Sequence, residues 1–292
     1  MTFLSYLIGG LSLGSVYALI ALGYSMVYGI ARMLNFAHGD IIMIGAYTAF
    51  SMVTAIGLPA PLGILSAIIV CTFLGVMIER LAYRPLRFAP GLAVLITAIG
   101  VSYFLQNAAQ NIWGADSKFF PQNFFPAGGI SIGGLLISWL SVITVITCIV
   151  IMLSISFFVY RTRTGSAMRA CSEDKDAAAL MGINVNHMIS LTFAIGSALA
   201  GIAAVLLAST YPSISPTMGS MPGIKAFTAA VLGGIGSIPG AFVGGLVLGI
   251  IEILAKAYLS QQLSDAIVFG MLIIILLLKP TGLFGKIGKE KV

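Results

Sequence analysis

The sequence predicts an all-α fold, a polytopic bundle of transmembrane helices with one short helix on the cytoplasmic side. Only 8% of the 292 residues are charged and 59% are apolar, with a mean hydropathy of +1.07. Ordinary soluble domains carry roughly 25% charged residues, which they need to cover their surface with polar groups. The composition therefore excludes soluble enzymes, nucleic-acid-binding proteins and disordered chains.

Long charge-free stretches divide the chain into membrane spans. A bilayer core of roughly 30 Å needs about 20 apolar residues of helix, whereas the strands of a membrane barrel alternate polar and apolar residues over about ten positions. The first span lacks a basic leader region and is too long for a signal peptide. We predict eight helical spans near residues 4–31, 41–57, 61–78, 91–112, 135–160, 188–209, 241–258 and 265–279.

The basic residues predict the topology. Most of them lie in three places, residues 79–87, residues 161–176 and the tail from Lys279, and the positive-inside rule puts all three in the cytoplasm. Three predicted spans separate the second loop from the tail, and an odd number cannot return the chain to the same side. We therefore expect about eight to nine spans, with residues 226–240 forming a short or broken crossing, and an external N-terminus.

The loop at residues 161–187 is the one sizeable polar segment. Ser172 is placed to cap a short helix, with acidic residues in its first turn, where the helix dipole favours anions. Gly182 lies where a helix stop is expected. Between them, three apolar residues recur at helical spacing: Ala177, Leu180 and Met181. The pattern favours either a docking helix for a soluble partner or a solvated loop with accidental helical spacing.

Four sequence blocks carry a resemblance to a known family. Residues 176–182, Asp-Ala-Ala-Ala-Leu-Met-Gly, resemble the EAA loop of ABC-importer permeases, with Asp for Glu and without the Ile-x-Leu-Pro that completes that motif. The other blocks are Leu-Asn-Phe-Ala-His-Gly-Asp at 34–40, Tyr-Arg-Pro-Leu-Arg at 83–87 and the glycine-rich 228–240. Taken in chain order, with the cytoplasmic loop third, the four blocks resemble the LivH-type permeases of branched-chain amino-acid ABC importers, in the hydrophobic amino-acid uptake family.

The resemblance implies a single permease domain over residues 1–292, in a bacterial inner membrane, with the C-terminus in the cytoplasm. It implies four kinds of partner: a second, LivM-like permease, two cytoplasmic ATPases, a periplasmic binding protein, and leucine, isoleucine or valine as substrate. It also implies that the coupling residues toward the ATPases are Gly165, Arg169, Asp176, Ala177, Ala178, Leu180, Met181 and Gly182.

Three groups of residues are candidates for the translocation pathway or its gate. Asn35, His38 and Asp40 precede the second predicted span, where Asp40 either caps that helix or contacts the charged groups of the substrate. Glu252 lies inside a span, four residues before Lys256, and is either half of a structural pair or a pathway residue. Lys225 is expected to snorkel at the outer interface. The glycine-rich segment offers exposed backbone or a hinge through Gly233, Gly234, Gly236, Pro239 and Gly240.

The sequence shows no pattern for metal binding, nucleotide binding or catalysis. Three cysteines and two histidines show no metal-ligand spacing, and no GxxxxGK[ST] phosphate-binding loop occurs. We expect no catalytic residues, no metal and no cofactor, with ATP hydrolysis performed by separate subunits. Two alternatives stay open at this point: a permease of the same family that carries urea or short amides, and a stand-alone secondary transporter. The EAA-like loop favours an ABC permease over the latter.

Overall fold

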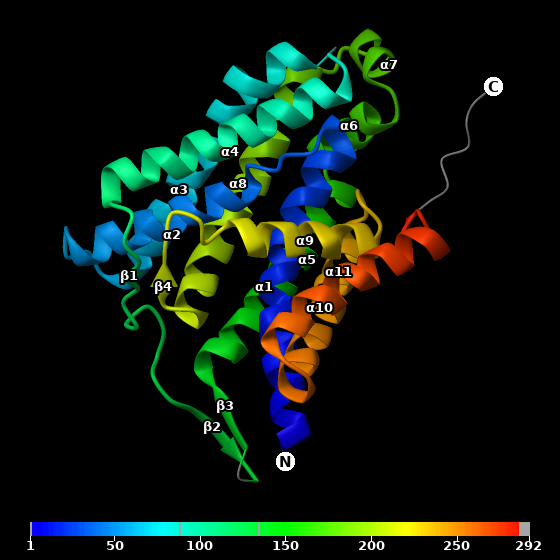
Figure 1. The fold of residues 1–292 in the computed structure, drawn as a ribbon. Helices are drawn as coiled ribbons and strands as arrows, with labels where there is room; N and C mark the ends of the chain where they lie inside the picture. Colours follow the sequence, from blue (N-terminus) through cyan, green and yellow to red (C-terminus); the bar gives the residue numbers. More distant parts are fainter. Residues whose placement is uncertain (1, 88, 134, 286–292) are drawn as a thin grey trace.

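The computed structural model describes residues 2–87, 89–133 and 135–285, and this part of the chain is all-α apart from four short strands (Figure 1). Of its eleven α-helices, seven are long and apolar enough to cross a membrane. The helix α3 continues into a π-helical turn and a 3-10 turn at Glu79–Leu86. The seven long helices are α1 (Thr2–Ala31), α3 (Ala60–Ile78), α4 (Gly91–Trp113), α5 (Trp139–Arg161), α8 (Val185–Thr210), α10 (Ile238–Tyr258) and α11 (Gln261–Leu278).

The structure contains two short helices, whereas the sequence predicted only one short crossing. The helix α2 (His38–Thr54) has 17 residues and α9 (Ser220–Gly233) has 14, so α2 is not among the long spans and α9 begins six residues before the predicted crossing. The span predicted from residue 135 begins at Trp139, because Leu135–Ser138 (β3) pairs antiparallel with Gly129–Ile132 (β2). The tail residues Lys286, Lys289 and Lys291 lie outside the described residues.

The order of helices repeats within the chain. Both α1–α4 and α8–α11 run as a long helix, a short helix and two long helices. The helix α1 packs antiparallel on α10, with Gly10 against Ile250 and Gly14 against Leu246. The matching pair, α3 and α8, packs antiparallel through Gly201 against Ala67 and Gly75 against Ser197. Glycines at these positions let helix backbones approach closely, which is how helices associate in lipid.

The two halves have opposite orientations. The helix α1 ends where α8 begins, because Ile30 and Met188 share one apolar cluster with Met168 of α6 (Arg163–Glu173). Midway along, the two central helices touch at Gly23 and Gly196. Inverted repeats of this kind commonly place a binding site where the halves meet, near the middle of the bilayer.

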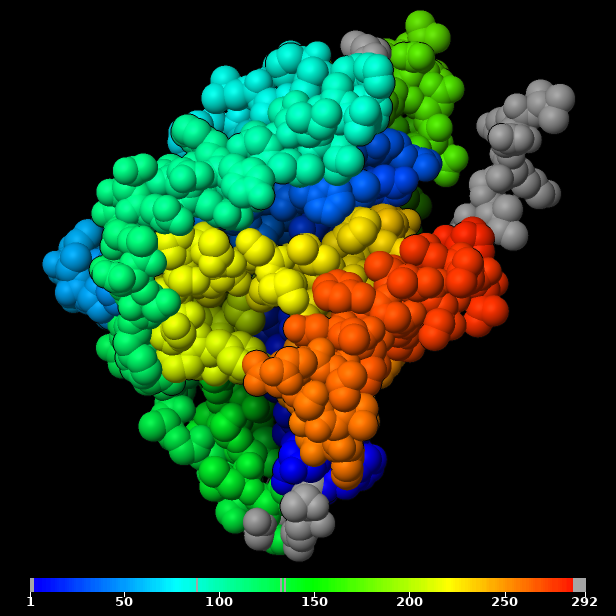
Figure 2. Space-filling model, in the orientation of Figure 1, coloured from blue at the N-terminus to red at the C-terminus, as the bar shows by residue number. Residues whose placement is uncertain are grey.

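The outer helices leave apolar surface uncovered. The helices α4, α5 and α11 are the least buried of the seven, and Figure 2 shows α9 (yellow) on the surface between α4 (cyan-green) and α11 (orange-red). At the end of the molecule opposite α6 and α7 (Lys175–Leu180), the connecting segments are tied together, because Lys118–Phe119 (β1) pairs antiparallel with Ser213–Ile214 (β4). The uncovered apolar surface of α4, α5 and α11 requires lipid or another subunit to cover it.

Candidate functional site

The chain turns back into the bundle after α1. Arg32 has φ 59°, and it is the one non-glycine residue with positive φ among those described, so the helix ends sharply there. Residues 33–37 then return alongside α1 until the His38 ring lies 4.7 Å from the Tyr24 ring and against Gly23. Because Gly23 precedes Ala31 by eight residues, α2 begins about 12 Å below the end of α1.

The short helix α9 begins at the same place. Gly219 and Gly223, before and within its first turn, pack directly against Gly39 in the first turn of α2. A methyl group on Gly39 would collide with the Gly219 carbonyl oxygen. Neither helix has a side-chain cap. The first N–H groups of a helix have no partner within the helix and sit at the positive end of its dipole, so two such ends converge here.

A glutamine of α4 bridges the two helix starts. The amide Nε2 of Gln106 donates to Asp40 Oδ1 at 2.9 Å, to Ser102 Oγ at 3.2 Å and to Ser220 Oγ at 3.4 Å. Gln106 belongs to a polar stripe of α4 that also contains Asn107, Gln110 and Asn111, and its neighbour Asn107 donates to a carbonyl of its own helix and faces outward. The stripe thus contributes one residue to this junction.

A pocket of about 410 Å³ opens at this junction. One end is polar, with Asp40, Ser102, Gln106 and Ser220, and the remaining wall is largely apolar or aromatic. A carboxylate suits an ammonium group, helix N-termini suit a carboxylate, and an apolar wall suits an aliphatic side chain. The pocket is lined by Tyr24, Phe36, Gly39, Asp40, Leu95, Ile99, Ser102, Tyr103, Gln106, Ser220, Gly223 and Ile224.

Asn35 and His38 lie beside this pocket rather than in its lining. The Tyr83 hydroxyl donates to Asn35 Oδ1 at 3.0 Å, which fastens the returning segment to the π-helical turn. His38 is buried against α1, and its Nε2 has no hydrogen-bond partner. Asp40 is the one member of this predicted trio that lines the pocket. Sequence reasoning missed Tyr24 and Ser220, because nothing local in the sequence shows that α1 and α9 meet α2.

The glycine-rich segment forms the turn between α9 and α10. Gly234 and Gly236 have φ 101° and 91°, which side chains rarely adopt, and Gly233 packs on the Gly240 carbonyl. Ser237 caps α10 by accepting from Gly240 N at 3.2 Å, and Pro239 occupies the first turn of that helix. The turn lies against Gly29, near the end of α1, and so at the same side as α6 and α7. These glycines therefore lie apart from the pocket lining.

Glu252 belongs to a buried ion cluster. Its Oε1 lies 2.7 Å from Lys225 Nζ and 2.6 Å from Lys256 Nζ, and Lys225 Nζ also lies 2.6 Å from Asp265 Oδ1. Lys225 is only 6% exposed, so the predicted snorkelling is wrong, because two carboxylates hold its ammonium group inside. The cluster ties α9 to α10 and α11. Glu252 is not part of the pocket lining.

The loop at 161–187 folds into two helices, α6 and α7. Asp174 caps α7 by accepting from Asp176 N and Ala177 N, both at 2.9 Å, whereas Ser172 bonds the Arg169 carbonyl, so the predicted cap was wrong by two residues. The cap lies later than predicted because α6 extends to Glu173, so Ser172 is still within α6 and α7 begins only after Asp174. Gly182, at the predicted helix stop, has φ 82° and follows the last residue of α7, Leu180, by two positions.

The predicted coupling residues divide into a fixed and an exposed set. Gly165 packs on the carbonyls of α5, and the Arg169 guanidinium lies 5.6 Å from the Tyr160 ring centre. Ala178 is buried. By contrast, Leu180 and Met181 are 89% and 82% exposed, the most exposed apolar side chains among the described residues. Two large apolar side chains in water indicate a contact surface.

Three comparisons with known proteins bear on this arrangement. The family described as the branched-chain amino acid transport system, permease component, matches residues 6–276. The chain is 47% identical to the high-affinity branched-chain amino acid transport system permease protein BraD of Pseudomonas aeruginosa, over 99% of this chain and 98% of the relative. It is 45% identical to the permease protein LivH of Escherichia coli, with the same coverage.

The fold is also found in a solved structure of low sequence identity. The structure of PsaBC from Streptococcus pneumoniae in complex with Fab aligns with 96% of this chain and 94% of that chain, at a TM-score of 0.51 and 14% identity. That likeness concerns the fold alone. Because the family match and the relatives span nearly the whole chain, this multi-pass membrane protein belongs to the family of branched-chain amino-acid transport permeases.

Proposed function

We propose that the pocket where α2 and α9 meet lies on the path by which this permease carries branched-chain amino acids through the membrane. The relatives that span nearly the whole chain are named as permease proteins of high-affinity branched-chain amino acid transport systems. The observation that supports the assignment most is the convergence of two helix starts on Asp40, with Gln106 between them.

The pocket offers one complementary group for each part of an aliphatic amino acid. Asp40 accepts hydrogen bonds from the ammonium group, and the starts of α2 and α9, which are the positive ends of their helix dipoles, attract the carboxylate. The side chain lies against Leu95, Ile99 and Ile224. Discontinuous helices with N-termini aimed at a substrate carboxylate are a recurring device of transporters. Urea lacks the aliphatic part and would leave this wall uncovered.

In this proposal, the chain works with a second, LivM-like permease, two cytoplasmic ATPases and a periplasmic binding protein, in a bacterial inner membrane. The apolar tip of α7, Leu180 and Met181, inserts into a groove of one ATPase, and Asp176 and Ala177 lie beside it. Gly165 and Arg169 pass the movement to α5 through the contacts described above. The C-terminus lies on the same cytoplasmic side.

The turn from Gly233 to Gly240 acts as the hinge of α9. Its first end is held by the tail, because Leu283 N and Phe284 N donate to the carbonyls of Leu232 and Gly233 at 2.9 Å. A rotation here would move the start of α9 relative to Asp40 and open or close the pocket. His38 supports the opposite wall by packing on Tyr24. Alternating access then follows from two states of one bundle, biased by ATP.

The test is uptake into proteoliposomes that contain the complete importer purified through a tag on this chain. We expect two ATPases and a second permease to co-purify, and ATP-dependent uptake of labelled leucine that requires binding protein and is competed by isoleucine and valine but not by urea. Uptake without ATP would support a secondary transporter. ATPase activity that ignores loaded binding protein, or competition by urea alone, would overturn the assignment.

A further inference from the structure

We propose a binding site for the phosphate group of an anionic phospholipid at the cytoplasmic end of α1 and α4. A second pocket, of about 460 Å³, lies there, and Leu95 is the one lining residue that it shares with the pocket at the junction of α2 and α9. Three cationic side chains from three separate segments line it: Arg32, Arg87 and Lys175. No acidic side chain is among the described residues of its lining.

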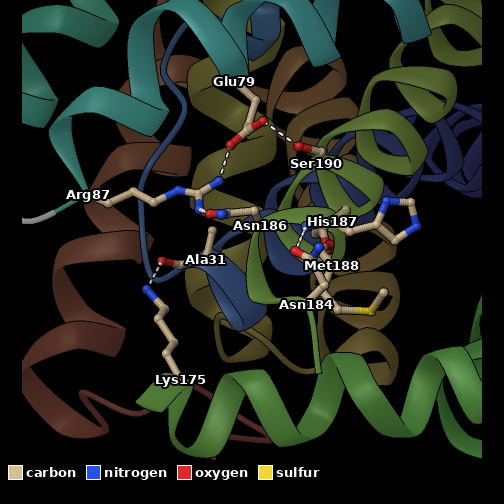
Figure 3. A network of polar contacts seen from close by, with 10 residues as sticks. Ala31, Glu79, Arg87, Lys175, Asn184, Asn186, His187, Met188 and Ser190 are labelled. Carbon is tan, nitrogen blue, oxygen red and sulfur yellow. Dashed lines mark hydrogen bonds and ion pairs between the residues drawn. The ribbon is translucent and has the colours of Figure 1, made fainter. Parts of the chain in front are cut away.

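The positive charges of this pocket are incompletely balanced. Lys175 Nζ donates to the Ala31 carbonyl at 2.9 Å, and Arg32 donates to the Ser172 carbonyl at 3.1 Å, so both cations bond neutral acceptors (Figure 3 shows the first contact). Burial, together with the charges of Arg87 and Arg32, lowers the pKa of Lys175. An anion bound between these groups would relieve their repulsion.

Arg87 contributes a largely buried cation to the pocket. Its side chain is 10% exposed and pairs with Glu79, which also accepts from Ser190 Oγ at 2.6 Å, and it donates to Asn186 as well (Figure 3). Among the described residues, Glu79 is the one carboxylate that forms a salt bridge with any of the three cations, and Asp176 acts on Lys175 only as a lesser influence that raises its pKa. The Arg87 Nε is buried without a hydrogen-bond partner. The guanidinium therefore has an N–H donor that its present partners do not use and that suits a phosphate oxygen. The buried cation is therefore held in place with unused donor capacity.

The surroundings fit a lipid rather than a soluble anion. The pocket lies at the cytoplasmic end of the long helices, the level of the headgroups, and the start of α4 at Gly91 also lines it. Its other walls are apolar, including Met33, Leu34 and Val94. Outward from it, Leu92 and Ile96 of α4 are 68% and 61% exposed and offer an apolar track for acyl chains. Basic pockets of this kind between membrane helices hold anionic headgroups.

The test is native mass spectrometry of the delipidated importer, titrated with phosphatidylglycerol or with phosphatidylcholine of the same acyl chains. We expect the importer to retain phosphatidylglycerol preferentially, and Arg32→Gln/Lys175→Gln to weaken that binding at least tenfold, with phosphatidylcholine binding unchanged. The charge-keeping pair Arg32→Lys/Lys175→Arg should keep the preference. The matched control is Arg161→Gln/Arg163→Gln, which removes two exposed basic residues on the same side.

Three outcomes would overturn the proposal. Equal binding of both lipids would do so, and so would an equal loss of phosphatidylglycerol in the control pair, because either result means a diffuse charge effect. Displacement of the lipid by millimolar inorganic phosphate or leucine would show instead that the pocket takes a small soluble ligand. Transport assays with the same variants are separate from this test, so a failure here leaves the assigned transport path unaffected.

Discussion

At the residue scale, the candidate site depends on a few polar groups brought together by distant parts of the chain. The sequence indicates Asp40, because an acidic residue in the first turn of an apolar helix is unusual and conspicuous. It also places Gln106 in a polar stripe of α4, but it does not show that this residue reaches Asp40 at 2.9 Å or Ser220 beyond it. Contacts across 66 and 114 residues of sequence depend on the tertiary packing.

Replacing Asp40 by Asn should abolish leucine uptake while the protein still assembles. The amide keeps the size of the side chain and its ability to accept from Gln106, but it removes the negative charge that pairs with the ammonium group. We expect uptake by the reconstituted importer to fall at least tenfold, since a charge-assisted hydrogen bond contributes about 1.5–3 kcal/mol. The control Asp116→Asn changes an exposed carboxylate of an outer segment and should leave uptake intact. Normal uptake by Asp40→Asn would contradict the role given to this carboxylate.

At the element scale, the short helices α2 and α9 are what the sequence predicts least well. The parity of the basic loops predicts one irregular crossing near residues 226–240, and the structure has the 14-residue helix α9 at Ser220–Gly233, which is not among the seven long spans. Hydropathy predicts an ordinary membrane span at α2, because the residues of α2 are as apolar as a span requires. Its actual start is set by the reversal at Arg32, which is a property of tertiary packing and of one backbone angle.

Gly39→Ala should stop transport because it separates the starts of α2 and α9. The added methyl group would meet the Gly219 carbonyl oxygen, which is backbone and cannot move aside cheaply. The matched control is Gly100→Ala in α4, where nothing lies within 4 Å and alanine favours the helix by about 1 kcal/mol. Uptake measurements on both variants in the complete importer check this. If Gly39→Ala transports as well as Gly100→Ala, the two helix starts do not form the site.

Within the ion cluster, replacing the more buried lysine should cost more free energy of unfolding than replacing the more exposed one. Lys225→Met leaves the buried Glu252 with one partner and Asp265 without Lys225, so we expect a loss of about 3 kcal/mol. Lys256→Met should cost about 1 kcal/mol or less, because its side chain is 27% exposed and Lys225 still neutralises Glu252. Thermal unfolding of the two purified variants gives the order. A larger loss in Lys256→Met would contradict this description of the cluster.

The exposed tip of α7 should be needed for coupling but not for folding. Leu180→Asp and Met181→Asp place charges where an apolar contact with the ATPase is proposed, and both side chains are almost fully exposed. We expect unchanged expression and thermal stability, with loss of ATPase co-purification and of uptake. An exposed apolar residue away from this loop, Leu62 (45% exposed), offers the control Leu62→Asn. Retained co-purification in both α7 variants would place the docking surface elsewhere.

At the scale of the whole molecule, the chain is two inverted halves whose short helices meet in the middle. The composition and charge pattern are sufficient to predict a polytopic helical bundle, and four sequence blocks are sufficient to identify the family. They do not predict the inverted repeat, because α1–α4 and α8–α11 share an order of helix lengths that only the boundaries of α2 and α9 make visible. The proposed path across the membrane depends on that symmetry.

The most direct measurement of this path is the reaction of a cysteine placed at Ser220 with a small, charged thiol reagent. Background labelling is low, because Cys71, Cys148 and Cys171 are buried and burial raises the pKa of the Cys171 thiol. In the complete importer, Ser220→Cys should react, and loaded binding protein and ATP should change its rate. The control Ser154→Cys, on the exposed apolar face of α5, should stay unreactive. An unreactive Ser220→Cys in every state would contradict a path through the junction of α2 and α9.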